Sequence, residues 1–160
     1  MKKIIILSII NLLFLNQQFF AQETKLSKDY DKVGKFQNGI AIVQKNKLVG
    51  AINEDGKEII PCEYERLTGF GSDGIGYSRK KKKVGLITKD GKILVENKYD
   101  FIGNIKNKKA IVKLDGLCGI INSTNGKVLV ELKYKKLIIG DGDMVTATNT
   151  DDTVTLLKIK

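Results

Sequence analysis

The sequence predicts an all-β protein made of tandem three-stranded β-meander repeats of about 35 residues, arranged as a curved or propeller-like array. Two observations predict this fold. Segments with the same order of features recur, and the glycines that open them, Gly50, Gly85 and Gly119, lie 35 and 34 residues apart. Such a period is typical of modular repeat architectures. The apolar runs are also short, rich in β-branched residues and bounded by Asp-Gly or Asn-Gly turns, as β-strands are.

The recurring segments are Val49–Leu67, Val84–Ile102 and Cys118–Leu137. Each has a glycine in an apolar run, a second glycine in a turn, another apolar run and a tyrosine. The tyrosines, Tyr64, Tyr99 and Tyr134, recur in register and could form a ligand-facing ridge. A packing role between units is favoured, because tyrosine combines an apolar body with a polar tip.

The first unit spans residues 36–67. Phe36–Val43 leads into a strand, Leu48–Asn53 forms the second strand and Lys57–Ile60 forms the third. Asp55-Gly56 predicts a type I′ turn. Pro61 restricts the third strand to a sheet edge or a bulge, since proline has no N–H to donate.

The second and third units, at 70–102 and 105–137, repeat this order. One turn, Ser123–Gly126, is a residue longer, which a bulge or a loop of three to four residues would absorb. Residues 138–160 form a degenerate unit that is expected to act as a cap. The middle strands are apolar on both sides, so we expect both of their faces to be covered.

The N-terminus has the order of a secretory signal peptide, with Lys2 and Lys3 before the apolar run Ile4–Leu15. We expect residues 1–22 to be removed by cleavage after Ala21 or Gln22. An uncleaved N-terminal anchor is the alternative, although the run is short for a membrane span. Residues 23–35 are then a polar leader, 36–160 are the repeat domain, and the mature chain has no transmembrane span.

Composition argues against catalysis. The 160-residue chain has no histidine, so the usual acid–base residue near neutral pH and the commonest metal ligand are both absent. No spacing singles out a pair of carboxylates. We therefore predict a protein that is not an enzyme and has no cofactor or catalytic residue.

The first unit carries a family resemblance. Residues 36–43, FQNGIAIV, with Gly50, Ile52, Gly56 and Pro61 resemble the bacterial WG-repeat (KWG) family. The likeness extends over Phe36 to Leu137, but the tryptophan that names the family is replaced by Val49, Val84 and Cys118. The resemblance implies β-rich interaction repeats without an agreed enzymatic activity.

The strongest charge feature is the run Arg79, Lys80, Lys81, Lys82 and Lys83, in a chain of net charge +10. Five adjacent cations would attract a polyanion. They could equally form a solvated turn that protects a sheet edge from aggregation, and this is the favoured interpretation. Nucleic acid is disfavoured as a partner, because no aromatic platform interleaves the lysines.

Two further groups of residues are candidate sites. Cys62 and Cys118, the only cysteines, are expected to be buried thiols, with a disulfide as the alternative in a closed array. Asp141, Asp143 and Asp151-Asp152 lack the ligand set of a calcium loop and predict ordinary acidic turns.

The sequence therefore predicts an exported, non-enzymatic β-repeat protein, periplasmic or secreted, that binds an unknown protein partner. The alternative is a polyanion-binding envelope protein that uses the turn from Arg79 to Lys83.

Overall fold

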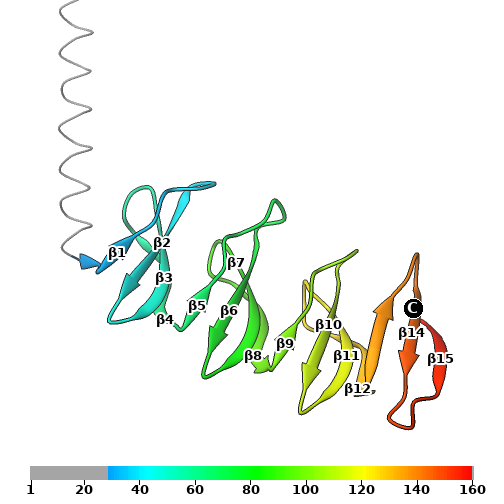
Figure 1. The fold of residues 1–160 in the computed structure, drawn as a ribbon. Helices are drawn as coiled ribbons and strands as arrows, with labels where there is room; N and C mark the ends of the chain where they lie inside the picture. Colours follow the sequence, from blue (N-terminus) through cyan, green and yellow to red (C-terminus); the bar gives the residue numbers. More distant parts are fainter. Residues whose placement is uncertain (1–28, 160) are drawn as a thin grey trace, which may run out of the picture. The chain divides into compact units, whose positions relative to one another are not determined.

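The computed structural model describes residues 29–159. The predicted signal peptide and the start of the polar leader lie outside the described residues. The chain divides into two compact units, Met1–Glu63 and Tyr64–Lys160. The described strands form four antiparallel sheets, and within each sheet the strands follow one another in chain order (Figure 1). Among residues 29–159, no helix is both long and apolar enough to cross a membrane.

Sheet 1 has the order β1-β2-β3-β4. Its strands are β1 (Lys32–Val33), β2 (Ile40–Lys45), β3 (Leu48–Asn53) and β4 (Glu58–Tyr64). Pro61 lies in the edge strand β4, as predicted. The buried residues Ala41, Val43 and Ile52 form the core of this sheet, with Tyr30 and Cys62 packed against them.

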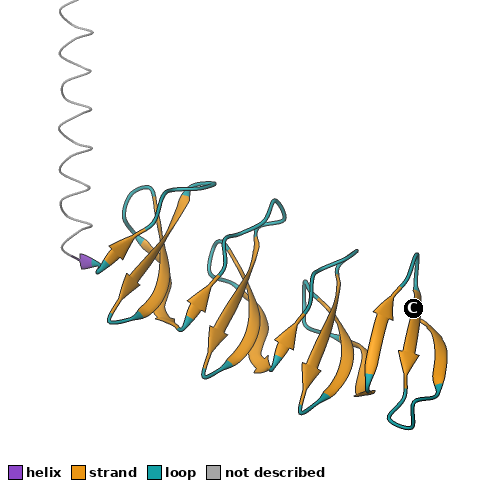
Figure 2. Cartoon of the chain, viewed as in Figure 1, coloured by secondary structure: helices purple, strands orange, loops and turns teal. Residues whose placement is uncertain are grey.

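Sheet 2 has the order β5-β6-β7-β8 and sheet 3 has the order β9-β10-β11-β12. The strands of sheet 2 are β5 (Arg66–Leu67), β6 (Ile75–Lys80), β7 (Lys83–Thr88) and β8 (Ile93–Tyr99). Those of sheet 3 are β9 (Phe101–Ile102), β10 (Lys109–Leu114), β11 (Leu117–Asn122) and β12 (Val128–Tyr134). Short loops join the strands (Figure 2).

Sheet 4 has three strands, β13 (Lys136–Ile139), β14 (Met144–Thr148) and β15 (Val154–Lys158). The all-β class and the tandem repeats are therefore confirmed, with sheets of three or four antiparallel strands. Sheets 1 to 3 each begin with a two-residue strand that the sequence did not predict, namely β1, β5 or β9. We call it the leading strand, and it follows Tyr30, Tyr64 or Tyr99. This strand is too short to leave a period-two pattern in the sequence.

Consecutive sheets of the second unit share hydrophobic cores. Between sheets 2 and 3 the core contains Leu86, Val95 and Tyr99 together with Ala110 and Val112. A second core joins sheets 3 and 4 in the same manner, and its buried members are Ile120, Tyr134, Leu137, Val145, Ala147 and Ile159. The outer strand of one sheet thus runs through its tyrosine into the leading strand of the next sheet.

The repeat tyrosines are buried, and Tyr99 and Tyr134 lie in the cores between consecutive sheets, which confirms the predicted packing role for these two. The middle strands are also buried over three successive residues, so both faces are covered as predicted. The structure adds a fourth tyrosine to the series. Tyr30 lies 34 residues before Tyr64 and directly precedes the residue that leads into β1.

The turn type predicted at Asp55-Gly56 is wrong. A type I′ turn needs positive φ at both central residues, and here only Gly56 has a positive φ, of 77°. Gly56 N–H donates to the Asn53 carbonyl and Asn53 N–H donates to the Lys57 carbonyl, which closes a three-residue loop. The loop at Ser123–Gly126 is one residue longer, as predicted, and is closed in the same way. There the Gly126 N–H donates to the Asn122 carbonyl.

Candidate functional site at the Lys81–Lys82 turn

The run from Arg79 to Lys83 folds as the hairpin that joins β6 to β7. Lys80 pairs with Lys83 across the hairpin, so the two central residues are Lys81 and Lys82. Their φ angles are 51° and 62°, in the left-handed region. This is the geometry of a type I′ turn, which strongly prefers Asn-Gly because L-residues with a Cβ are strained there.

Three of the five cations have partners in the structure. The Arg79 Nε lies 3.6 Å from the Glu65 Oε2, and the Lys83 Nζ lies 2.6 Å from the Asp100 Oδ1. The Lys80 ammonium lies 5.7 Å from the centre of the Tyr64 ring. These contacts tie the two strands of the hairpin to the chain that leads from one sheet to the next.

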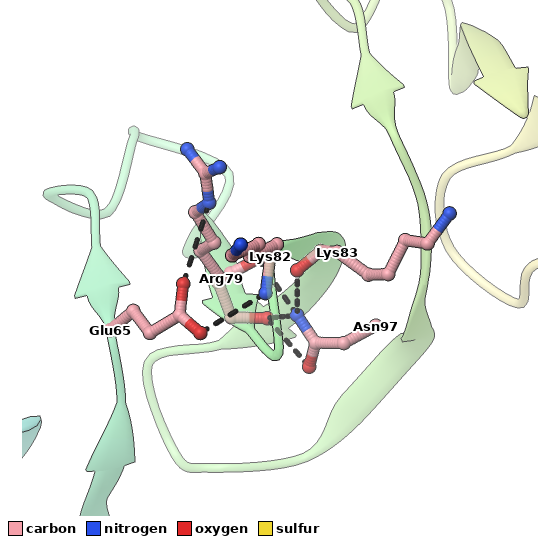
Figure 3. A network of polar contacts seen from close by, with 6 residues as sticks. Glu65, Arg79, Lys82, Lys83 and Asn97 are labelled. Carbon is pink, nitrogen blue, oxygen red and sulfur yellow. Dashed lines mark hydrogen bonds and ion pairs between the residues drawn. The ribbon is translucent and has the colours of Figure 1, made fainter.

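The side chains of Lys81 and Lys82 are exposed at the tip. No ion pair involves either of them within residues 29–159. The Lys82 backbone N–H donates to the Glu65 Oε1 at 3.0 Å, so the peptide is held while the side chain stays in solvent (Figure 3). Of the five cations in the predicted run, two therefore remain available to bind a polyanion, and both lie on a turn whose backbone is fixed.

A residue that the sequence analysis did not single out braces this hairpin. The side-chain amide of Asn97, on β8, donates to the Ser78 carbonyl at 2.8 Å and to the Lys83 carbonyl at 3.2 Å (Figure 3). The equivalent positions in the other repeats hold Cys62 and Leu132, which have no amide to donate. Asn97 could have been found in the sequence, because it is the polar residue at a repeat position that is otherwise apolar.

The Asp100 carboxylate links two hairpins. It accepts from the Lys83 ammonium and from the Asp115 backbone N–H, at 2.8 Å. The hydrogen bond from Lys83 is the main reason that the pKa of Asp100 lies below its usual value, and the bond from Asp115 adds to it. The same contact raises the pKa of Lys83.

Three lysines outside this run are engaged in ion pairs. Lys106, Lys109 and Lys135 pair with aspartates. Those aspartates are Asp141, Asp143 and Asp152, in the turns that the sequence predicts to be ordinary acidic turns. Among residues 29–159, no group of three or more His, Cys, Asp or Glu could hold a metal ion.

Both cysteines are free thiols and partly buried. Burial raises the pKa of the Cys62 thiol, so less of it is present as the reactive thiolate at neutral pH than in an ordinary cysteine. The Cys118 Sγ lies 3.6 Å from the Lys135 carbonyl oxygen. Neither thiol has a histidine to activate it, because the chain contains none.

Successive antiparallel sheets of a fixed repeat define the class of this chain as a β-repeat protein. The "WG containing repeat" family matches residues 23–48, 50–83 and 85–118, more than half of the chain. The chain belongs to this family, which confirms the resemblance seen in the sequence.

A comparison with curated proteins found no match. Among solved structures, the chain is similar to the crystal structure of the computationally designed Ika4 protein. The identity is 16%, the match covers 80% of this chain and 89% of that one, and the TM-score is 0.40.

Proposed function

We propose that this chain is an exported, non-enzymatic β-repeat protein that acts as a protein-interaction module in the bacterial envelope or outside the cell. The observation that supports the proposal is that the residues that recur in every repeat have structural roles. The glycines, the tyrosines and the acidic residues that follow Tyr30, Tyr64 and Tyr99 all serve the scaffold. Four exposed large apolar side chains lie together on one face of sheet 4, Ile138, Met144, Val154 and Leu156, and a contiguous apolar face marks a candidate interaction surface.

Export is supported by the sequence of residues 1–22 alone. A tagged chain, cross-linked in the cells that make it, should be captured with a protein of the envelope or the medium. Its mature N-terminus should be Gln22 or Glu23. A chain that starts at Met1 in the soluble cytoplasm would overturn the export part of the proposal.

A second function, binding of an envelope polyanion, is favoured by one observation. Lysine occupies both left-handed positions at Lys81 and Lys82, whereas asparagine takes the first position in the pairs Asn46-Lys47 and Asn107-Lys108. Residues that break a local rule mark candidate functional sites. Their side chains extend from a turn whose backbone is held by Glu65.

The test separates charge from stability. Lys82→Gly removes one cation and relieves the left-handed strain, so it should stabilise the fold by about 1 kcal/mol while lowering the salt needed to elute the chain from heparin. Lys108→Gly is the matched control, because Lys108 also has a positive φ, of 59°. Equal losses of heparin retention in both variants, or retention insensitive to salt, would exclude a polyanion site at this turn.

A further inference from the structure

The two arginines of the chain face each other in sheet 2. Of the 28 lysines and arginines in the sequence, only Arg66 and Arg79 are arginines. The strand register pairs Arg66, on β5, directly with Arg79, on β6. Residues paired in this way project from the same face of a sheet, with Cβ atoms about 5 Å apart. The fold therefore brings the two arginine side chains together.

Among the four described sheets, only sheet 2 carries two cations at this pair of positions. The residues two places after the repeat tyrosines are Lys32, Arg66, Phe101 and Lys136, and their partners across the sheet are Gln44, Arg79, Lys113 and Thr148. Like charges directly opposite each other destabilise a sheet. Both arginine side chains are exposed, so packing does not require them. The pair is thus a departure from the repeat that the scaffold does not explain.

The two guanidinium groups are accessible to a ligand. Within residues 29–159, the Arg66 side chain has no ion pair or hydrogen bond. Arg79 contacts Glu65 through its Nε, and Figure 3 shows its two terminal nitrogens pointing away from Glu65. The other oxygen of Glu65 accepts from the Lys82 N–H. One carboxylate therefore holds Arg79 and the lysine turn in place while the terminal nitrogens of Arg79 stay exposed.

Two adjacent arginines favour phosphate as the ligand. The planar guanidinium donates in a fork that matches the oxygens of a phosphate or a carboxylate. A carboxylate carries one charge and is satisfied by one fork, whereas a phosphate monoester carries about −1.5 to −2 at pH 7 and offers three acceptor oxygens. Lys81 and Lys82 follow Arg79 in the turn and add two exposed cations. Glu65 offsets one of these four positive charges.

We infer that Arg66 and Arg79 together bind one phosphate group of a polyanion, with Lys81 and Lys82 contacting neighbouring phosphates. This inference rests on the second proposed function, polyanion binding at this turn, and names its ligand class. The phosphate belongs either to a soluble polymer or to lipid headgroups, which present the same chemical group.

Two cation-exchange matrices with different anionic groups test the ligand class. Arg66→Lys keeps the net charge but replaces the fork with a single ammonium. It should lower the salt needed for elution from phosphocellulose and leave elution from carboxymethyl-cellulose unchanged. It should also bind soluble polyphosphate about tenfold more weakly, because charge-assisted hydrogen bonds are lost. Arg79→Lys is the second variant. Lys136→Gln is the control, since it removes a charge at the equivalent position of sheet 4 and should affect both matrices equally.

Stability provides a readout that does not depend on a matrix. Inorganic phosphate should raise the urea midpoint of the wild-type chain above its value in chloride of the same ionic strength, because a ligand stabilises the state that it binds. The Arg66→Lys variant should show little of this increase. Urea unfolding also verifies that each variant is folded.

The source of the phosphate is found with two further probes. Wild-type chain that co-sediments with phosphatidylcholine vesicles containing phosphatidic acid, where Arg66→Lys does not, assigns the site to lipid headgroups. Binding of soluble polyphosphate without these vesicles assigns it to a polymer.

An Arg66→Lys variant that elutes from phosphocellulose like the wild type would overturn the inference. If Lys82→Gly nevertheless lowers retention on both matrices, polyanion binding at the turn stands without a phosphate site. Wild-type retention that is insensitive to salt would exclude both the phosphate site and the polyanion function.

Discussion

Gly50, Gly85 and Gly119 are needed for the close approach of a neighbouring strand, and none of them has a positive φ. A Cβ built on Gly85 would lie 2.5 Å from the Val95 carbonyl oxygen and 3.0 Å from the Asn97 nitrogen. In the ladder, Val84 pairs with Tyr99 and Leu86 with Val95, so three residues of β8 pass over Gly85 alone. The glycine therefore makes the bulge of the outer strand possible.

Gly85→Ala should destabilise the chain by about 3 kcal/mol, because the backbone that the new methyl group meets cannot move aside as a flexible side chain would. Urea unfolding measures the change. Gly69→Ala is the control, since a Cβ at Gly69 meets nothing within 4 Å. Equal stabilities of the two variants would show that the strand does not approach Gly85 this closely.

The Tyr99 hydroxyl is buried, and no described residue hydrogen bonds to it. Burying a hydroxyl without a partner costs free energy, while the ring itself contributes to the core. Tyr99→Phe should therefore raise the free energy of unfolding by about 1 kcal/mol. A loss of similar size, measured by urea unfolding, would show that the hydroxyl is hydrogen bonded in solution.

The first hairpin of each of sheets 1 to 3 is fastened by the acidic residue after the repeat tyrosine. Asp31 accepts from the Asn46 N–H, Glu65 accepts from the Lys82 N–H and Asp100 accepts from the Asp115 N–H. The backbone N–H of each acidic residue also donates to the strand of that hairpin. The acidic residue after each tyrosine thus fixes the tip of the hairpin to the chain that leads into the same sheet.

Asp100 should make stability dependent on acid pH. Its pKa is lowered in the folded chain, chiefly by the hydrogen bond from Lys83, so its contribution is complete above the ordinary value of 3.8 and is lost as the pH falls below it. Asp100→Asn should lower the urea midpoint at pH 7, and the difference from wild type should shrink at pH 2.5. The exposed Asp90 provides the control variant Asp90→Asn. A difference that persists unchanged at pH 2.5 would contradict this role.

Much of the sheet pattern was predictable, because period, glycines and turn signals are local features of the sequence. The leading strands were not, since two residues such as Arg66–Leu67 carry no periodic signal. The repeat at Tyr30 was missed because the residues before it are polar, so only the spacing to Tyr64 marks it. At the candidate site, the turn was located but its pairing was not, because Glu65 and Asp100 approach the lysines only through the fold.

At the scale of the whole molecule, the second unit is stabilised by cores that form between one sheet and the next. Each sheet needs a neighbour to cover its apolar face, which is the general property of repeat proteins. Sheet 4 therefore differs from the sheets before it in what it leaves exposed, and this difference directs attention to the β15 end as a contact surface.

The proposed interaction function requires contact through the exposed apolar side chains of sheet 4. Site-specific photo-cross-linking from position 156, in the cells that make the chain, tests this requirement, with exposed Lys89 as the control position. We expect a discrete adduct with one protein from position 156 and none from position 89. No adduct from position 156, or the same products from both positions, would contradict the claim.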